Sequence, residues 1–218
     1  KSKVRLTSYP CQERNGLVWA YLGPQAPPPA LPALEWNLVP GNQYYMTKRV
    51  QACNWAQSLE GGIDSSHGSF LHSDLQRPDG INDRNGVRVA LLPYMYDDRH
   101  PRFEVMDTSY GAHIAARRSG EPDSYYWRIT EFLMPWYTMI PPFGKNPTFS
   151  GHAWVPMDDE HTITWSVHWH PTRALTEREL DYWRSGKQIH SGPHQYTPKT
   201  SAPEGAWIPA ANIANDYF

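Results

Sequence analysis

Five segments between residues 102 and 170 are rich in β-branched and aromatic residues and follow one another at short intervals. Residues typical of turns, such as Gly, Pro and Asp, separate them. Strands this close along a chain pair as antiparallel neighbours. The segments are RFEVMDT, GAHIAARRS, YYWRITEFLMP, TFSGHAWVPM and TITWSVHWHP. The sequence therefore predicts an antiparallel sheet in this half of the chain.

The N-terminal part of the chain has a different character. The run VRLTSYPCQERNGLVWAYLGP predicts two strands joined by a turn at Asn15 and Gly16, a β-hairpin with few other strands to pair with. The run PQAPPPALPAL, residues 24–34, is rich in proline and can form neither a helix nor a strand ladder. We therefore expect a domain boundary there, and we interpret the preceding hairpin as a piece of a larger unit.

Three further elements are expected from local patterns. QYYMTKRVQA alternates as a strand, and a helix is expected to follow it. One strand is expected near VRVALLPYMY, inside an otherwise long loop over residues 73–101. TERELDYWRSG predicts a short helix, because Thr176 is followed three positions later by Glu179 in a capping box.

Composition excludes several classes of function. The formal net charge is -2, and no basic run stands out beyond Arg117–Arg118, so neither nucleic acid nor an anionic membrane is expected as a partner. No signal-peptide pattern and no apolar run of roughly 20 residues is present, and we expect a cytoplasmic protein. The two cysteines are too few for a disulfide framework. Ten Trp and thirteen Tyr suit an aromatic-walled cavity, but for most of them the sheet is the better explanation.

One stretch, NWAQSLEGGIDSSHGSFLH, gathers four groups that could bind or support a metal: Glu60, Asp64, His67 and His72. With ten histidines in the chain, one His-x4-His pair arises by chance nearly as often as not. The two acids at fixed positions before the pair lower that chance to about one in a thousand. The four positions therefore call for a common explanation.

Two histidines and a carboxylate can hold Fe(II) on one face of its octahedron. The alternative is that His67 and His72 are exposed helix residues. Five positions apart, they would lie about 140° from each other on an ideal helix, so we expect the helix to distort or end near Gly68. Asp64 either caps the turn that follows Gly61–Gly62 or accepts the ring N–H of a histidine. Glu60 is either a solvated helix residue or a supporting hydrogen-bond partner, and Asn54 and Gln57 are weaker supporting candidates.

The pattern Glu60-x3-Asp64-x2-His67-x4-His72, preceded by CNWAQSLEGGID, resembles the iron-binding signature of Rieske non-haem iron aromatic-ring-hydroxylating oxygenases. GLVWAYLGP is similar to the strand that closes their Rieske domain, and ANIANDYF resembles a stretch of the subgroup related to phthalate 4,5-dioxygenase. The resemblance implies an α+β fold for residues 31–218. This catalytic domain would be a helix-grip (START-like) domain, cut before its end, with a curved antiparallel sheet around helices. Residues 1–30 would be the tail of an all-β Rieske domain and its connector.

By this resemblance, His67 and His72 bind a mononuclear Fe(II), with Glu60 and Asn54 supporting the site. Asp64 would be the acid that bridges to a Rieske-cluster histidine of the neighbouring subunit and carries the electron path. The third iron ligand would be an Asp beyond Phe218; Asp216 is the only late carboxylate, but it precedes that position in the family pattern. The chain has no Cys-x-His or Cys-x2-His, so the ligands of a [2Fe–2S] cluster are expected before Lys1.

The implied function is that of the oxygenase α subunit in aromatic catabolism. It would hydroxylate a planar, carboxylated aromatic substrate with dioxygen. NADH would supply the electrons through a flavin- or ferredoxin-type reductase, and the subunit would form a homotrimer. Oxidative O- or N-demethylation at the same iron remains an alternative, as do a metal-free helix-grip ligand-binding module and, with less support, a zinc hydrolase.

The other histidines and three arginines have simpler interpretations. His168 and His170 share a strand face and could line a pocket, but core or solvated positions are favoured. Arg117, Arg118 and Arg128 lie in predicted strands. One of them pointing inward would bind a ring carboxylate through two parallel hydrogen bonds, although an outward, solvated side chain is expected for each.

Overall fold

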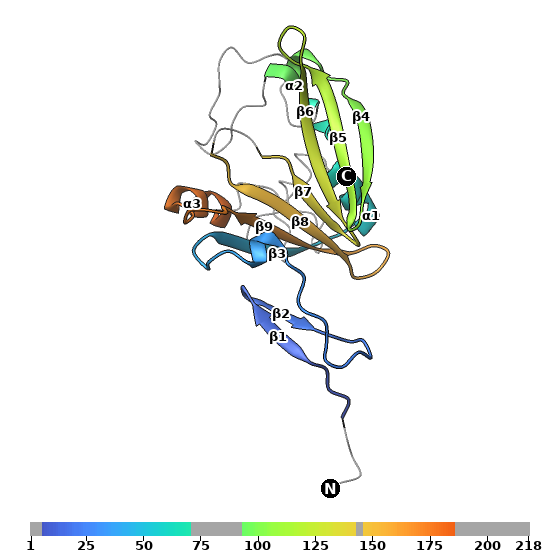
Figure 1. Cartoon of the computed structure of the whole chain (residues 1–218), viewed down its shortest axis with the longest axis vertical. Coiled ribbons are helices and arrows are strands. Elements are labelled where there is room, and N and C mark those ends of the chain that lie inside the picture. Colours follow the sequence, from blue (N-terminus) through green and yellow to red (C-terminus); the bar gives the residue numbers. More distant parts are fainter. Residues whose placement is uncertain (1–5, 71–92, 143–145, 186–218) are drawn as a thin grey trace, which may run out of the picture.

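The computed structural model describes residues 6–70, 93–142 and 146–185. Seven strands form one curved antiparallel sheet, and a separate two-stranded hairpin lies beside it (Figure 1). The sheet contains, in spatial order, β3 (Tyr44–Gln51), β9 (Thr162–Trp169), β8 (Phe149–Pro156), β7 (Tyr137–Ile140), β6 (Tyr125–Leu133), β5 (Gly111–Ser119) and β4 (Arg102–Thr108). The predicted antiparallel sheet and the α+β fold class are confirmed. The short strand β7 was not predicted.

Along β9 both faces of the sheet are buried or half-buried, and they differ in chemistry. In β9 the side chains alternate between Thr, Thr, Ser and His on one face and Ile, Trp, Val and Trp on the other. We call the first the inner face: Thr162, Thr164, Ser166 and His168 are all at most 1% exposed. The opposite, outer face carries Ile163, Trp165, Val167 and Trp169. The buried inner face is therefore polar, and the apolar face lies on the other side of the sheet.

Hydrogen bonds between neighbouring strands satisfy much of this polar inner face. The Thr164 hydroxyl donates to the Gln51 side chain, and the Trp154 indole N–H donates to Thr138 Oγ1 over 2.9 Å. Ser150 Oγ and His168 Nδ1 are 2.8 Å apart. Because a buried polar group without a partner is costly, these pairs are what allow polar side chains to occupy the interior.

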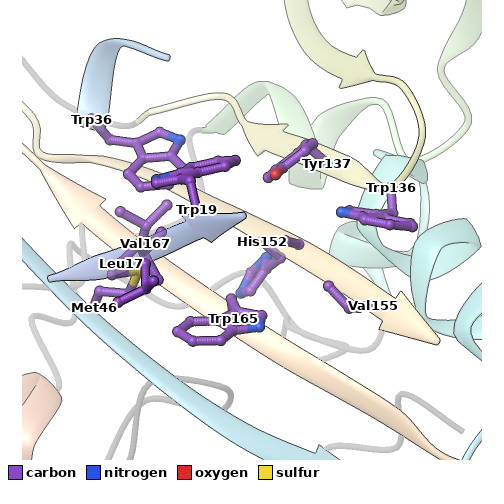
Figure 2. Close-up of a pocket in the computed structure, with 12 residues that line it drawn as sticks. Leu17, Trp19, Trp36, Met46, Trp136, Tyr137, His152, Val155, Trp165 and Val167 are labelled. Atoms are coloured by element: carbon purple, nitrogen blue, oxygen red, sulfur yellow. The ribbon is translucent and has the colours of Figure 1, made fainter. Parts of the chain in front are cut away.

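The outer face packs against the hairpin of β1 (Cys11–Arg14) and β2 (Leu17–Ala20). Its turn has φ of 50° at Asn15 and 75° at Gly16, the left-handed values that the predicted Asn-Gly turn requires. The buried apolar cluster consists of Trp36, Val39, Val167 and Trp169. Leu17 and Trp19 of the hairpin pack against it. Figure 2 shows Trp19 and Trp36 side by side in the pocket, of about 180 Å³, between hairpin and sheet. The pocket belongs to the outer face.

Helix α1 (Trp55–Ile63) lies against the inner face. Asn54 caps its first turn, since its side chain accepts the N–H of Ala56 over 2.9 Å. The close approach depends on Gly62: a Cβ there would stand 2.7 Å from Thr138 Oγ1 and 2.9 Å from Trp154 Nε1. Only a residue without a side chain lets the helix backbone come this near to β7 and β8.

Two short helices complete the described structure. In α3 (Glu177–Arg184) both hydrogen bonds of the predicted capping box between Thr176 and Glu179 form. Its Trp183 stacks on His168 with the ring centres 4.4 Å apart.

The strand predicted near VRVALLPYMY is wrong at its C-terminal end, where Pro93–Asp97 form helix α2. Proline suits a first helical turn, because its missing N–H has no partner there anyway. The structure describes no helix long and apolar enough to cross a membrane.

Candidate metal centre

The segment that carries Asp64 and His67 is a tight turn, residues 64–69, which we call the ligand turn. Helix α1 ends at Ile63, Asp64 is extended with φ of -77° and ψ of 110°, and a single 3₁₀ turn, η2 (His67–Ser69), follows. The sequence predicted that the helix would distort or end near Gly68; α1 instead ends at Ile63, five positions earlier, and Gly68 lies in the 3₁₀ turn. The break frees the Asp64 side chain to fold back over the turn.

Both oxygens of Asp64 are used inside the ligand turn. Oδ1 accepts the N–H and the hydroxyl of Ser66 over 2.7 and 2.5 Å, and Oδ2 accepts the N–H of His67 over 3.1 Å. Oδ2 also lies 3.4 Å from His67 Nδ1. Burial raises the pKa of this carboxyl, but the hydrogen bonds from Ser66 and the proximity of His67 outweigh it and leave the pKa below its usual value. Asp64 thus caps the turn and faces the histidine ring at once.

The surroundings of His67 fit a metal ligand. Its side chain is 20% exposed, and with Nδ1 toward Asp64, Nε2 lies on the far side of the ring. A carboxylate beside Nδ1 favours the tautomer whose Nε2 lone pair is available to a metal. His72 and Asp216 lie outside the described residues. Within the described part of the chain, no three His, Cys, Asp or Glu side chains gather closely enough to hold a metal ion.

Two of the three arginines singled out from the sequence point inward, so the expectation of solvated side chains is wrong for them. Arg118 and Arg128 are 1% and 5% exposed and lie on the inner face. Arg117, on the opposite face of β5, stacks over the ring of Tyr125 at 4.4 Å. Alternation shows that Arg117 and Arg118 lie on opposite faces, but the sequence does not show that both faces are covered.

The supporting residues predicted around the iron make other contacts. Glu60 is exposed, and its backbone carbonyl accepts the N–H of Asp64 over 3.0 Å. Asn54, besides capping α1, donates its side-chain amide to the Asp159 carbonyl over 3.0 Å. A role for either residue toward the iron stays a prediction. His168 and His170, 1% and 4% exposed, occupy the core positions favoured from the sequence.

Sequence reasoning missed a third arginine on the inner face. Arg49 of β3 is 8% exposed, and burial lowers its pKa to about 10. His152 of β8 is 5% exposed, and burial together with nearby Arg49 lowers its pKa to about 3, so its ring is neutral. The sequence pattern that could have pointed to Arg49 is the alternation within QYYMTKRVQA, which places Arg49 on the same side of its strand as Gln51.

Comparison with known proteins places the sequence of this chain in a family. Residues 20–194 match the family model described as LigXa C-terminal domain like. The whole chain is 33% identical, over 222 residues, to the oxygenase subunit of 3-chlorobenzoate-3,4-dioxygenase from Comamonas testosteroni, and covers 49% of it. It is 35% identical to the oxygenase subunit of phthalate 4,5-dioxygenase from Pseudomonas putida, over 86% of this chain and 43% of that protein. The chain thus spans about half the length of these relatives.

A solved structure shows the same fold. The terminal oxygenase of carbazole 1,9a-dioxygenase from Nocardioides aromaticivorans IC177 superposes with a TM-score of 0.54 at 16% identity, covering 87% of this chain and 57% of that one. At this identity the likeness concerns the fold alone. With the family match over most of its length, the chain belongs to the LigXa C-terminal-domain-like family, the catalytic domain of Rieske oxygenases.

Proposed function

We propose that this chain is the catalytic part of an oxygenase component that hydroxylates a carboxylated aromatic compound with dioxygen at a mononuclear non-haem iron. Family membership supports the reaction class. The observation that carries the assignment of the site is that Asp64 Oδ2 lies 3.4 Å from His67 Nδ1 in a ligand turn whose Ser65 and Ser69 are buried and bonded to Arg118. Such carboxylate–histidine pairs orient the ring and raise the basicity of a metal-binding nitrogen.

In this proposal His67, His72 and an Asp outside the described residues hold the iron. When bound, the iron supplies the redox chemistry for the reduction of dioxygen. The chain itself holds the ligands and keeps water out: α1 seals one part of the inner face, and Asp64 keeps the His67 ring in one orientation. Excluding water prevents side reactions.

The electrons would come from a Rieske [2Fe–2S] cluster elsewhere in the subunit. NADH would reduce it through a flavin- or ferredoxin-type reductase. The Asp64 side chain is 37% exposed, so a histidine of a neighbouring subunit can approach it in a homotrimer. Its low pKa keeps it ionised, as an acceptor of a charge-assisted hydrogen bond must be.

A carboxylated substrate fits the charge of the inner face. Arg49 and Arg128 bring two buried guanidinium groups to it. A planar guanidinium can bind a carboxylate through two parallel hydrogen bonds. The relatives are named for 3-chlorobenzoate and phthalate, both aromatic carboxylates.

The test uses the full-length subunit with its Rieske centre. His67→Ala and His72→Ala should each deplete mononuclear iron at least roughly tenfold and abolish oxygenation, while the Rieske absorption stays intact. His113→Ala is the matched control, because His113 lies on the outer face beside Glu131 and should keep wild-type iron. Wild-type iron content in both His67→Ala and His72→Ala would refute the site.

The same preparation tests the substrate class. Aromatic acids should be hydroxylated and the matching aromatic amides should not, because an amide lacks the charge that a buried guanidinium binds. Equal turnover of acid and amide would contradict the carboxylate proposal. Formaldehyde release from methoxy-substituted acids would favour demethylation, and a wild-type subunit without iron would favour a metal-free binding module.

A further inference from the structure

We propose that Arg118 is a positioning residue that holds the ligand turn against the sheet and so keeps His67 and Asp64 in their binding geometry. The inference rests on the proposed function, because it takes His67 to be an iron ligand. Arg118 would not touch the iron or the substrate. It would act through the backbone of the turn.

Arg118 contacts residues on both sides of His67 in the sequence. Arg118 Nη2 donates to the Ser65 carbonyl over 2.7 Å and lies 3.4 Å from Ser69 Oγ. The first acceptor lies two positions before His67 and the second two positions after it. Both serines are buried, at 9% and 0% exposure. One nitrogen of one side chain therefore joins the beginning and the end of the ligand turn.

A third contact fixes the orientation of the guanidinium. Arg118 Nε donates to the Asp98 carbonyl over 3.1 Å, just after helix α2. Asp98 is itself held to β5, since its Oδ2 accepts the N–H of Ser119 over 2.8 Å. On the α2 side of the turn, Gly68 lies under Met95, whose Cε would be 3.3 Å from a Cβ at Gly68. The turn is thus held between α2 and a rigid strand.

The electrostatic environment shows that burying the charge of Arg118 costs free energy. Burial lowers the pKa of Arg118 and nearby Arg128 lowers it further, while Asp98 and Asp64 act in the opposite direction. Among the described residues no carboxylate forms an ion pair with Arg118, and Nη1 has no hydrogen-bond partner. A buried cation held mainly by neutral acceptors is destabilising compared with an apolar side chain of similar size. A positioning role gives a reason for an arginine here.

Lysine cannot replace this arrangement. Its single ammonium keeps the charge but lacks the planar fork that places Nη2 and Nε in fixed relation to each other. In a lysine variant the Ser65 carbonyl and the Asp98 carbonyl would compete for one group. The ligand turn would then open more often, and His67 and Asp64 would move with it.

The experiment measures the turn and the iron separately in the full-length subunit. The variants are Arg118→Met and Arg118→Lys, and the matched controls are Arg117→Met and Arg117→Lys on the outer face of the same strand. The dissociation constant for Fe(II) is measured by competition with a chelator. Amide hydrogen exchange of residues 64–70 is measured in the iron-free protein, where no metal holds the turn.

Arg118→Met should bind Fe(II) about 10- to 100-fold more weakly, the range seen when partners of metal ligands are removed. Arg118→Lys should show a smaller loss, about 3- to 10-fold, and in both variants exchange of residues 64–70 should rise about tenfold or more. Both Arg117 variants should stay within about twofold of the wild type, since their stacking on Tyr125 lies on the other face.

Wild-type iron affinity and wild-type exchange in a folded Arg118→Lys variant would overturn the proposal, whatever Arg118→Met does. Equal losses in the Arg117 controls would also overturn it, because they would show a general effect of weakening β5. The proposed function fails differently. If His67→Ala keeps its iron, the site itself is wrong, whereas iron loss in His67→Ala with wild-type Arg118 variants rejects the positioning role alone.

Discussion

At the residue scale, the chain contains the same local geometry twice. In the turn between β8 and β9, Asp158 Oδ1 accepts the N–H groups of Glu160 and His161 over 2.8 and 2.7 Å and lies 3.0 Å from His161 Nδ1. This repeats the pattern of Asp64 and His67. An Asp three positions before a His is therefore a common turn-capping unit and not in itself a metal site. The buried surroundings of the ligand turn, including Arg118, distinguish the two.

Asp64→Asn separates capping from electron transfer. Asparagine caps about as well as aspartate, so the free energy of unfolding should change by less than about 0.5 kcal/mol. If the charge holds a Rieske histidine across a subunit boundary, reoxidation of the reduced cluster by dioxygen with substrate bound should slow about tenfold or more. Stopped-flow absorption of the cluster measures this rate.

Asp158→Asn provides the control for that measurement, since it makes the same change in the same local geometry away from the ligand turn. It should leave reoxidation at the wild-type rate. Wild-type reoxidation in Asp64→Asn as well would leave Asp64 with its capping role alone.

At the scale of elements, the packing of α1 against the sheet determines where the ligand turn begins. Gly62→Ala would place a methyl group against Thr138 Oγ1 and Trp154 Nε1 and push the end of the helix outward. We expect a loss of about 1–3 kcal/mol in the free energy of unfolding, as for overpacked cores. Iron affinity should fall with it, because the helix end carries Asp64. Urea unfolding and iron titration measure the two effects.

The neighbouring glycine is the matched comparison. Among the described residues, nothing outside its own helix lies within 4 Å of a Cβ at Gly61, so Gly61→Ala should stabilise α1 by about 0.5–1 kcal/mol and leave iron binding unchanged. A tolerated Gly62→Ala, equal to Gly61→Ala in both measurements, would show that the close approach of helix and sheet is dispensable.

The elements that the sequence predicted are those whose signal is local. Eight strands, helix α1 and the helix at Thr176 follow from local patterns such as alternation, turn residues and a capping box. Strand β7 was not predicted because Tyr137–Ile140 is short, and a single turn residue, Pro135, separates it from β6. The pattern around Pro93 predicts a strand where the structure has helix α2, because its apolar residues continue an apolar run. Local pattern cannot reveal which face of a strand will be polar and buried.

The candidate site likewise has one part that local sequence patterns predict and another part that they do not. The spacing of Asp64 and His67 is local and could be predicted, but the helix ends at Ile63, earlier than the break that was expected near Gly68. The hydrogen bond from Arg118 to Ser65 joins two elements far apart in the chain. No spacing along the sequence encodes that contact. It follows only from the register of β5 and the seating of α1.

At the scale of the whole molecule, the polar inner face sets the response to acid. The histidines at 152 and 168 have their pKa lowered by burial to about 3, while an unfolded histidine titrates near 6.5. Below about pH 6.5 the unfolded chain therefore binds protons that the folded chain does not. Stability is fully present above that pH and falls as the pH drops toward 3.

Between pH 7.5 and pH 5.0, each of these histidines should remove about 2 kcal/mol from the free energy of unfolding. His168→Asn should reduce the acid-induced loss by about that amount, because asparagine can bond Ser150 without titrating. Urea titrations at the two pH values provide the measurement, and parallel pH curves for wild type and His168→Asn would contradict the interpretation.

The order of strands in the sheet also has a consequence for how the chain reaches its native state. Strands β4 to β9 pair with their neighbours in sequence, so each closes only a short loop. Strand β3 instead pairs with β9, joining Gln51 to Thr162 across most of the chain. Loop-closure entropy makes this the slow contact to form. Because β3 leads directly into α1 and the ligand turn, we expect a newly synthesised chain to gain the geometry of the ligand turn only after this edge strand has docked.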